Sequence, residues 1–185
     1  MISSGGPSSA VLEVDGFAWR TAGPLDASAL EALAARSGNR ALFYLPQSVA
    51  EFAGTVGGPG FRMPMLCLRG SKPIGAAATK QRNQRNLNLH LICFFADPVD
   101  AALPLAIYVR HLFWSFPLHR IFCQLPSVSG AAAYVRLLKG VGFQEEGMVR
   151  GHAMVGGRPR DLVALAVLRR EFEIWCRENE KRLTL

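Results

Sequence analysis

The feature that most constrains the fold is a change of hydrophobic period inside the most apolar part of the chain. In residues 87–95 (LNLHLICFF) the side chains alternate between two faces, which is the period of a β-strand. Asp97 and Pro98 interrupt this run. In residues 101–116, apolar side chains lie on nearly every side of a helix, and Pro104 fits because it falls in the first turn. A buried strand that leads into a buried helix indicates an α/β fold.

Turn residues and apolar periods divide the rest of the chain. Strands are expected at residues 11–20, 63–69, 73–79, 121–125, 144–155 and 161–168. Further helices are expected at residues 29–36, 47–55, 130–139 and 169–185. Turns at 70–71 and 156–159 predict two hairpins, and the polar, basic segment 80–86 is expected to be a loop. This order of elements predicts the α/β class with a mixed sheet.

The length of 185 residues fits one domain. Half of the residues are apolar and 19% are charged, which excludes a disordered or collagen-like chain. We expect a flexible tail at 1–10, a domain at 11–170 and a solvated helical tail at 171–185. No secretory signal is visible at 1–10, and 87–109 lacks the roughly 20 uninterrupted apolar residues of a membrane span. The expectation is a cytoplasmic monomer or homodimer without membrane contact.

The net charge of +7 is concentrated in the middle of the chain. Between residues 52 and 144 the only acidic residues are Asp97 and Asp100, whereas ten lysines and arginines fall in the same stretch. Such a block attracts polyanions, including nucleic acid and nucleotide phosphates. The alternative is a basic surface that serves only solubility.

The spacing of the cysteines, histidines and serines does not support a metal site or a serine hydrolase. The four cysteines have no CxxC spacing, and three lie in apolar strand-like runs, which favours free thiols: Cys67, Cys93, Cys123 and Cys176. Three histidines have no carboxylate or thiol at metal-ligand spacing: His111, His119 and His152. No Gly-x-Ser-x-Gly motif is present. We therefore assign no metal, disulfide or serine nucleophile.

Residues 134–171 carry a recognisable succession of a helix and two strands. The residues that define this pattern are Leu138, Gly142-Phe143, Glu146-Gly147, Arg150, the hairpin 157–161 and Leu168-Arg169-Arg170-Glu171. This run resembles the end of the GCN5-related N-acetyltransferase (GNAT) superfamily, nearest to its ribosomal-protein alanine acetyltransferase branch. The resemblance implies a mostly antiparallel, twisted mixed sheet flanked by helices. In it, parallel strands four and five, here 87–95 and 121–125, splay apart. An acyl donor would enter the splay from one side and an amine from the other.

Three positions depart from the family pattern. Where the family has a glycine-rich loop that cradles the coenzyme A pyrophosphate, residues 97–104 offer two carboxylates, two prolines and no glycine. Asp100 is interpreted as the N-cap of the following helix. Ala131 stands where the family has an Asn that touches the coenzyme, and Leu138 where many members have a proton-donating Tyr. Acyl-coenzyme A therefore remains a co-substrate only with a rebuilt site, and no tightly bound cofactor is expected.

The candidate site residues lie on the two splayed strands and just after them. The resemblance implies a general base on strand four, where His90 lies opposite the leucine face; the alternative is a structural histidine. Tyr134 is a candidate acid or substrate contact, or else a core residue. The residues assigned to donor binding are Phe94, Phe95, Ser127 and Ser129, where the two serines can instead cap a helix.

Some members and relatives of this family take their acyl group from aminoacyl-tRNA, so the resemblance also allows a donor that needs no pyrophosphate cradle, and the cationic residues are compatible with it. The candidates for binding tRNA phosphates are Lys80, Arg82, Arg85, Arg150, Arg158 and Arg160. Three functions stay open: an amide-forming transferase that uses aminoacyl-tRNA, a conventional acyl-coenzyme A N-acetyltransferase, and a non-catalytic binding module of the same fold. The acceptor would be a small-molecule or peptide amine.

Overall fold

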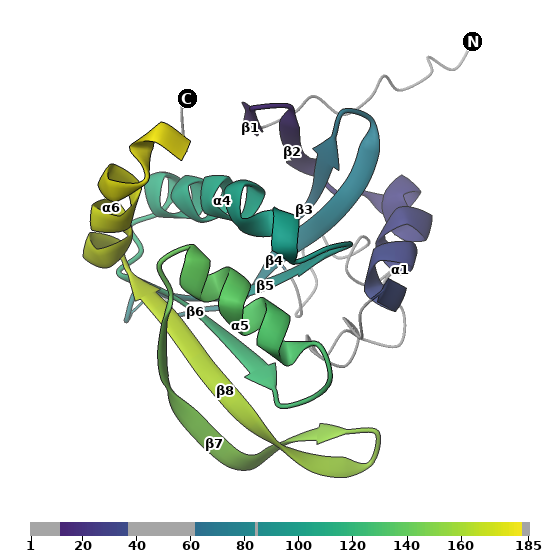
Figure 1. Ribbon diagram of the computed structural model, residues 1–185, viewed down its shortest axis with the longest axis vertical. Helices are drawn as coiled ribbons and strands as arrows, with labels where there is room; N and C mark the ends of the chain where they lie inside the picture. Colours follow the sequence, from purple (N-terminus) through teal and green to yellow (C-terminus); the bar gives the residue numbers. More distant parts are fainter. Residues whose placement is uncertain (1–11, 37–61, 84, 183–185) are drawn as a thin grey trace.

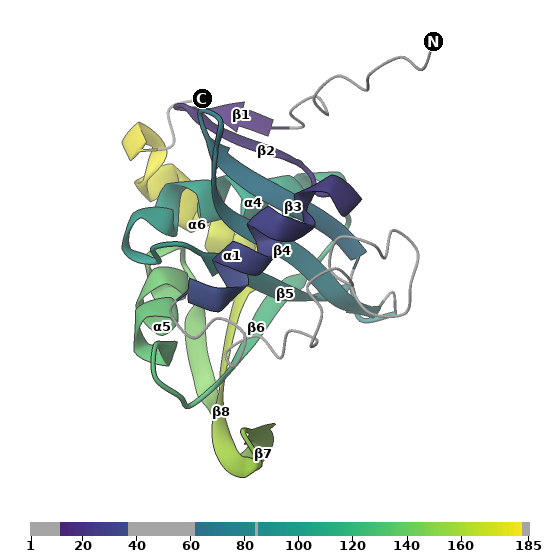
Figure 2. The same cartoon turned by 90° about the vertical axis from the view of Figure 1, so that its right-hand side faces the viewer.

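The computed structural model describes residues 12–36, 62–83 and 85–182 (Figures 1 and 2). The expected tail at 1–10 and the expected helix at 47–55 lie outside these residues. The strands are β1 (Leu12–Val14), β2 (Phe17–Thr21), β3 (Arg62–Arg69), β4 (Lys72–Asn83), β5 (Asn88–Phe95), β6 (Arg120–Pro126), β7 (Gln144–Val155) and β8 (Arg158–Leu168). The helices are α1 (Ala27–Ala35), α4 (Ala102–Ser115), α5 (Ala131–Gly140) and α6 (Arg169–Glu178), with 3-10 turns η1 (Pro24–Asp26), η3 (Val99–Ala101) and η4 (Glu180–Arg182).

These strands form one sheet in the order β1-β2-β3-β4-β5-β6-β8-β7. Strands β5 and β6 are parallel, and every other neighbouring pair among the described strands is antiparallel. Helices α4 and α5 cover one face of the sheet (Figure 1), and α1 covers the other (Figure 2). The predicted α/β class, with its mixed sheet flanked by helices, is confirmed.

Trp19 of β2 links the first half of the sheet to α4. Its side chain is fully buried, and its Nε1 donates a 3.0 Å hydrogen bond to the carbonyl oxygen of Pro104. The indole stacks on Tyr108 at 4.8 Å between ring centroids and makes an edge-to-face contact with Phe95 at 6.3 Å between centroids. The start of α4 is thus held against the strand end that leads into it.

The single strand expected at 11–20 is wrong. Asp15 and Gly16 have positive φ angles of 49° and 76°, and they turn the chain so that β1 pairs antiparallel with β2. An Asp-Gly pair between strand-forming residues is a strong hairpin signal, because both turn residues must tolerate positive φ. The N-terminal segment is therefore a hairpin at the edge of the sheet.

The loop expected at 80–86 is also wrong over its first half. Strand β4 continues to Asn83 and pairs with β5 as far as Asn88, with a bulge between Lys80 and Arg82. Strand pairing uses backbone groups, so a polar sequence can extend a ladder where a neighbouring strand supplies the partners. The basic segment is consequently part of the sheet, and the connection to β5 is short.

The helix after β5 begins differently from the expectation. Asp100 does not cap it; the carboxylate of Asp97 accepts a 2.9 Å hydrogen bond from the backbone N–H of Val99, and the 3-10 turn η3 leads into α4. The solvated helix expected after residue 168 exists as α6, but one side of it is buried. There Phe172 packs against Phe113 with ring centroids 5.5 Å apart.

Among the described residues, no helix is long and apolar enough to cross a membrane. The same residues contain no group of three or more His, Cys, Asp or Glu side chains placed to hold a metal ion. Burial raises the pKa of the Cys67 and Cys123 thiols to about 12. Both thiols therefore stay protonated and unreactive at neutral pH.

Candidate functional site

Strands β5 and β6 lie side by side at one end and separate toward the other. Asn88 pairs with Arg120, Leu89 with Ile121 and His90 with Phe122, and the pairing stops there. Beyond that point, β5 stays paired with β4 and β6 stays paired with β8. The predicted splay is confirmed. We call the region between residues 91–95 of β5 and 123–126 of β6 the β5–β6 opening.

His90 occupies the last paired position before this opening. Its imidazole stacks on Phe122 with ring centroids 4.8 Å apart and the rings within 5° of parallel. Lys80 lies directly across from it on β4. Burial, and secondarily the positive charge of Lys80, lower the pKa of His90 to about 4. The imidazole is therefore neutral at physiological pH and can accept a hydrogen bond.

Tyr134 reaches from α5 to the far end of β5. Its hydroxyl accepts a 2.8 Å hydrogen bond from the backbone N–H of Phe95 and lies 3.3 Å from the carbonyl oxygen of the same residue, to which it donates. The side chain is fully buried. A hydroxyl held in this way is engaged as both donor and acceptor with the strand. It therefore cannot donate a proton to a substrate without first leaving Phe95.

The other residues assigned to donor binding differ in exposure: the two phenylalanines are buried and the two serines are exposed. The side chains of Phe94 and Phe95 are 0% and 1% exposed, so their rings belong to the core. Ser127 and Ser129 are exposed just beyond β6, where the backbone N–H of Ser127 donates to the carbonyl of Asp161. Neither serine caps α5, because Gly130 holds the N-cap position without a side-chain bond. Among these four residues, Phe95 has backbone groups that point away from β4, because the backbone N–H of the adjacent Ala96 bonds to the carbonyl of Ile74 on β4.

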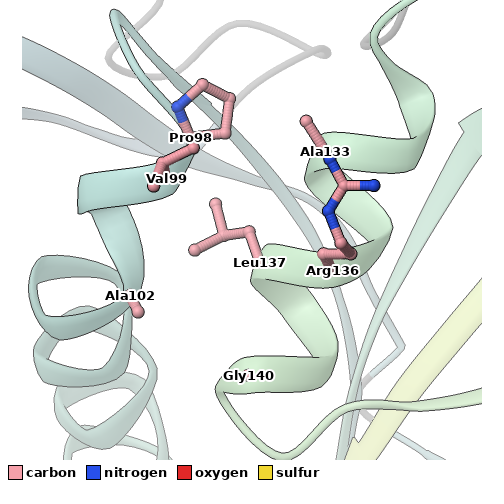
Figure 3. A pocket seen from close by; sticks show the side chains of 7 residues that line it. All are labelled: Pro98, Val99, Ala102, Ala133, Arg136, Leu137 and Gly140. Atoms are coloured by element: carbon pink, nitrogen blue, oxygen red, sulfur yellow. The ribbon is translucent and has the colours of Figure 1, made fainter.

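A pocket of about 210 Å³ lies between the start of α4 and α5, outside the opening (Figure 3). Its lining is Pro98, Val99, Ala102, Ala133, Arg136, Leu137 and Gly140. Arg136 supplies the only cationic side chain of this lining, and the carboxylates of Asp97 and Asp100 are exposed on the adjacent loop. The pocket is thus mainly apolar.

The six candidate phosphate-binding residues form two separate groups. One row of paired residues crosses four neighbouring strands: Asn83 on β4, Asn88 on β5, Arg120 on β6 and Leu168 on β8. This row lies at the closed end of the β5–β6 opening, which is the end where β5 and β6 are paired. Lys80, Arg82 and Arg85 belong to this end. Arg158 is ten residues from Leu168 along β8, so it lies about 30 Å away along the strand.

The second group, which we call the arginine hairpin, consists of Arg150, Arg158 and Arg160 on β7 and β8. It lies beyond the open end, because Leu162 pairs with Pro126 where β6 finishes. All three arginines are exposed. No carboxylate within the described parts of the chain forms an ion pair with them.

Three residues that contribute to the site were not identified from the sequence. Phe122 supports His90, Asp97 holds the N–H of Val99, and Arg136 borders the pocket. A signal existed for Asp97, because aspartate commonly bonds a backbone N–H two residues later. No sequence signal fixes the register of β5 against β6, which pairs His90 with Phe122.

Comparison with known proteins identifies the fold. No family model matches this sequence, and no curated protein does. Among solved structures, a GCN5-related N-acetyltransferase from Brucella melitensis has a TM-score of 0.73 at 18% identity, over 96% of this chain and 87% of that chain. The ribosomal-protein-S5-alanine acetyltransferase from Vibrio fischeri has a TM-score of 0.68 at 14% identity, over 87% and 97%. Mycobacterium smegmatis RimJ in complex with CoA-disulfide has a TM-score of 0.65 at 18% identity, over 84% and 83%. The chain therefore has the fold of GCN5-related N-acetyltransferases, as the sequence predicts.

In the 3-10 turn η3 that leads into α4, two backbone N–H groups are already engaged in hydrogen bonds. The N–H of Val99 is bonded to Asp97, and the N–H of Ala101 is directed to the carbonyl of Pro98. A phosphate at this helix start would compete with a carboxylate for the same N–H group and would be repelled by its charge.

Proposed function

We propose that this chain is an N-acyltransferase that forms an amide on an amine acceptor at the β5–β6 opening. The observation that carries the proposal is the end of strand pairing at His90 and Phe122, within a fold shared with acetyltransferases. A splayed pair of parallel strands brings a polar side chain to the place where two substrates can meet.

In this proposal His90 binds and orients the acceptor amine. A neutral imidazole accepts a hydrogen bond from the amine N–H, which directs the nitrogen lone pair at the acyl carbonyl. With a pKa of about 4, His90 is too weak a base to hold the amine proton as a stable imidazolium. It acts instead as an orienting acceptor that passes the proton on. The amine is a small molecule or the free terminus of a peptide.

For the donor we propose aminoacyl-tRNA. The amine nitrogen would bond to the carbonyl carbon of the ester, the bond to the 3′ oxygen of the tRNA would break, and the amine proton would end on the released 3′ hydroxyl. Such an ester is already activated and needs no pyrophosphate cradle. The arginine hairpin at the open end supports this donor, because phosphate contacts supply most non-specific nucleic-acid affinity. A donor of this kind places the protein in the cytoplasm.

The test is transfer from radiolabelled, mixed aminoacyl-tRNA to a panel of a polyamine, free amino acids and a short peptide, read by mass. We expect one acceptor to gain the mass of one aminoacyl group. With that acceptor, His90→Gln should lower kcat/KM by about 10-fold or more at unchanged tRNA affinity, because orientation and proton transfer are lost. The exposed His152→Gln is the matched control.

Acetyl-coenzyme A serves as the comparison donor in the same assay. The structural similarity to RimJ, which was solved with CoA-disulfide, favours this conventional donor. Transfer from acetyl-coenzyme A alone would assign the conventional N-acetyltransferase activity and overturn the tRNA donor. Transfer from neither donor to any acceptor would favour the non-catalytic binding module.

A further inference from the structure

We propose that Tyr134 determines donor choice by closing the β5–β6 opening against an extended acyl carrier such as the pantetheine arm of coenzyme A. The inference deepens the proposed function and rests on it for its biological meaning. Its structural content, however, is tested by binding alone.

The first observation concerns the direction of the backbone groups at the end of β5. The N–H of Ala96 donates a 2.8 Å hydrogen bond to the carbonyl of Ile74, on the β4 side. Because backbone groups alternate along a strand, the N–H and C=O of Phe95 point the other way, toward β6. No β6 residue pairs with them. These two groups are thus the ones that an extended ligand in the opening would use.

The second observation is that Tyr134 already uses both groups. Its hydroxyl accepts from the N–H of Phe95 at 2.8 Å and donates to the C=O at 3.3 Å. The Tyr134 hydroxyl therefore makes the two hydrogen bonds to Phe95 that the C=O and N–H of an amide in a bound ligand would otherwise make. An amide-bearing arm can bind β5 there only after the fully buried Tyr134 side chain has moved.

The third observation is that Phe95 itself is held in place. Its ring lies over Gly75, where an added Cβ would come within 2.2 Å of the ring, and it makes an edge-to-face contact with Trp19. The strand end cannot shift easily to present its backbone elsewhere. Access to the opening from the α5 side is accordingly controlled by Tyr134 rather than by movement of β5.

The test measures binding of acetylpantetheine, which carries the arm without the phosphates, by titration of the ¹⁵N-labelled protein. Tyr134→Ser removes the ring and frees Phe95, whereas Tyr108→Phe removes the hydroxyl of another fully buried tyrosine, on α4. We expect wild type and Tyr108→Phe to show no saturable binding at millimolar ligand. Tyr134→Ser should bind acetylpantetheine saturably, at least about 10-fold more tightly than the lower limit that the titration sets for the dissociation constant of wild type. This binding should shift the Phe95 amide signal. Saturable binding by wild type at Phe95, or no gain in folded Tyr134→Ser, would overturn the proposal.

A second variant covers the case in which Tyr134→Ser does not fold. Tyr134→Phe keeps the ring and removes only the hydroxyl, so the Phe95 amide should exchange its hydrogen at least about 10-fold faster, while Ala96 stays protected. Unchanged exchange at Phe95 would refute the role of the hydroxyl. These readouts use no transfer assay, so failure of the proposed enzymatic function would leave them intact and is distinguished from failure of this inference.

Discussion

At the scale of single residues, His90 shows how burial changes a side chain that looks catalytic in the sequence. Alternation along the strand places it opposite the leucine face, and the structure adds the stacked ring of Phe122 and the nearby ammonium of Lys80. Both burial and Lys80 disfavour the imidazolium form. The residue is therefore a neutral hydrogen-bond acceptor at neutral pH, which fits the orienting role proposed above.

The lowered pKa of His90 predicts acid sensitivity of the fold. Its pKa is about 4 in the folded protein against 6.5 for an ordinary histidine, so between these pH values the unfolded chain binds a proton that the folded chain does not. The stabilising effect is fully present above pH 6.5 and is lost as the pH falls to 4, to an extent of about 3 kcal/mol. Urea unfolding of wild type and His90→Gln across this range measures it.

The variant His90→Gln should lose less stability than wild type between pH 7 and pH 4. The exposed His152→Gln serves as control and should follow wild type. Parallel loss of stability in wild type and His90→Gln would show that His90 titrates normally in the folded protein.

At the scale of elements, the contact between β4 and β5 shapes the end of β5 that borders the opening. Gly75 pairs with Phe95, and the phenyl ring occupies the space where any side chain at Gly75 would lie. The end of β5 that bonds Tyr134 therefore depends on a glycine in the neighbouring strand. A strand-interior glycine often marks such a close approach.

Replacing this glycine should be costly. Gly75→Ala places a Cβ 2.2 Å from the Phe95 ring, so we expect a loss of about 1 to 3 kcal/mol in the free energy of unfolding. Gly140→Ala in α5 is the matched control; nothing lies within 4 Å of its added Cβ, and it should be neutral or slightly stabilising. Denaturant titration compares them. Combining Gly75→Ala with Phe95→Leu should recover part of the loss, and purely additive effects would contradict the contact.

At the scale of the whole molecule, the sheet distributes the positive charge to two ends. Lys80, Arg82 and Arg85 lie at the closed end of the β5–β6 opening, and the arginine hairpin lies beyond its open end. Under the proposed function, a donor that enters at the open end would pass the arginine hairpin. The net charge of +7 thus contains two sets of cations with different relations to the site.

This arrangement predicts which cations bind tRNA. The double variant Arg158→Gln and Arg160→Gln should weaken tRNA binding and reduce the slope of log affinity against log salt by up to about 2, since each phosphate contact contributes about 0.9 in duplexes and less in single strands. Arg85→Gln, at the other end of the sheet, should leave the slope unchanged. Filter binding at several salt concentrations gives both values. A larger effect from Arg85→Gln would place the nucleic acid at the closed end instead.

The sequence alone determined the class of fold and the order of the strands and helices from β3 to α6, because hydrophobic period and turn residues act locally. It also located His90 on a strand face and revealed that residues 97–104 lack a phosphate loop. It failed where a neighbouring strand decided the outcome: β4 extends through Asn83 because β5 is beside it.

The tertiary structure decided what meets at the site. The pairing of His90 with Phe122 and the bonding of Tyr134 to Phe95 join residues 32 and 39 positions apart in the chain. Strand register and helix packing set such contacts, and neither has a local signal. The physical reason is that a backbone hydrogen bond takes whichever partner the packed fold brings within reach.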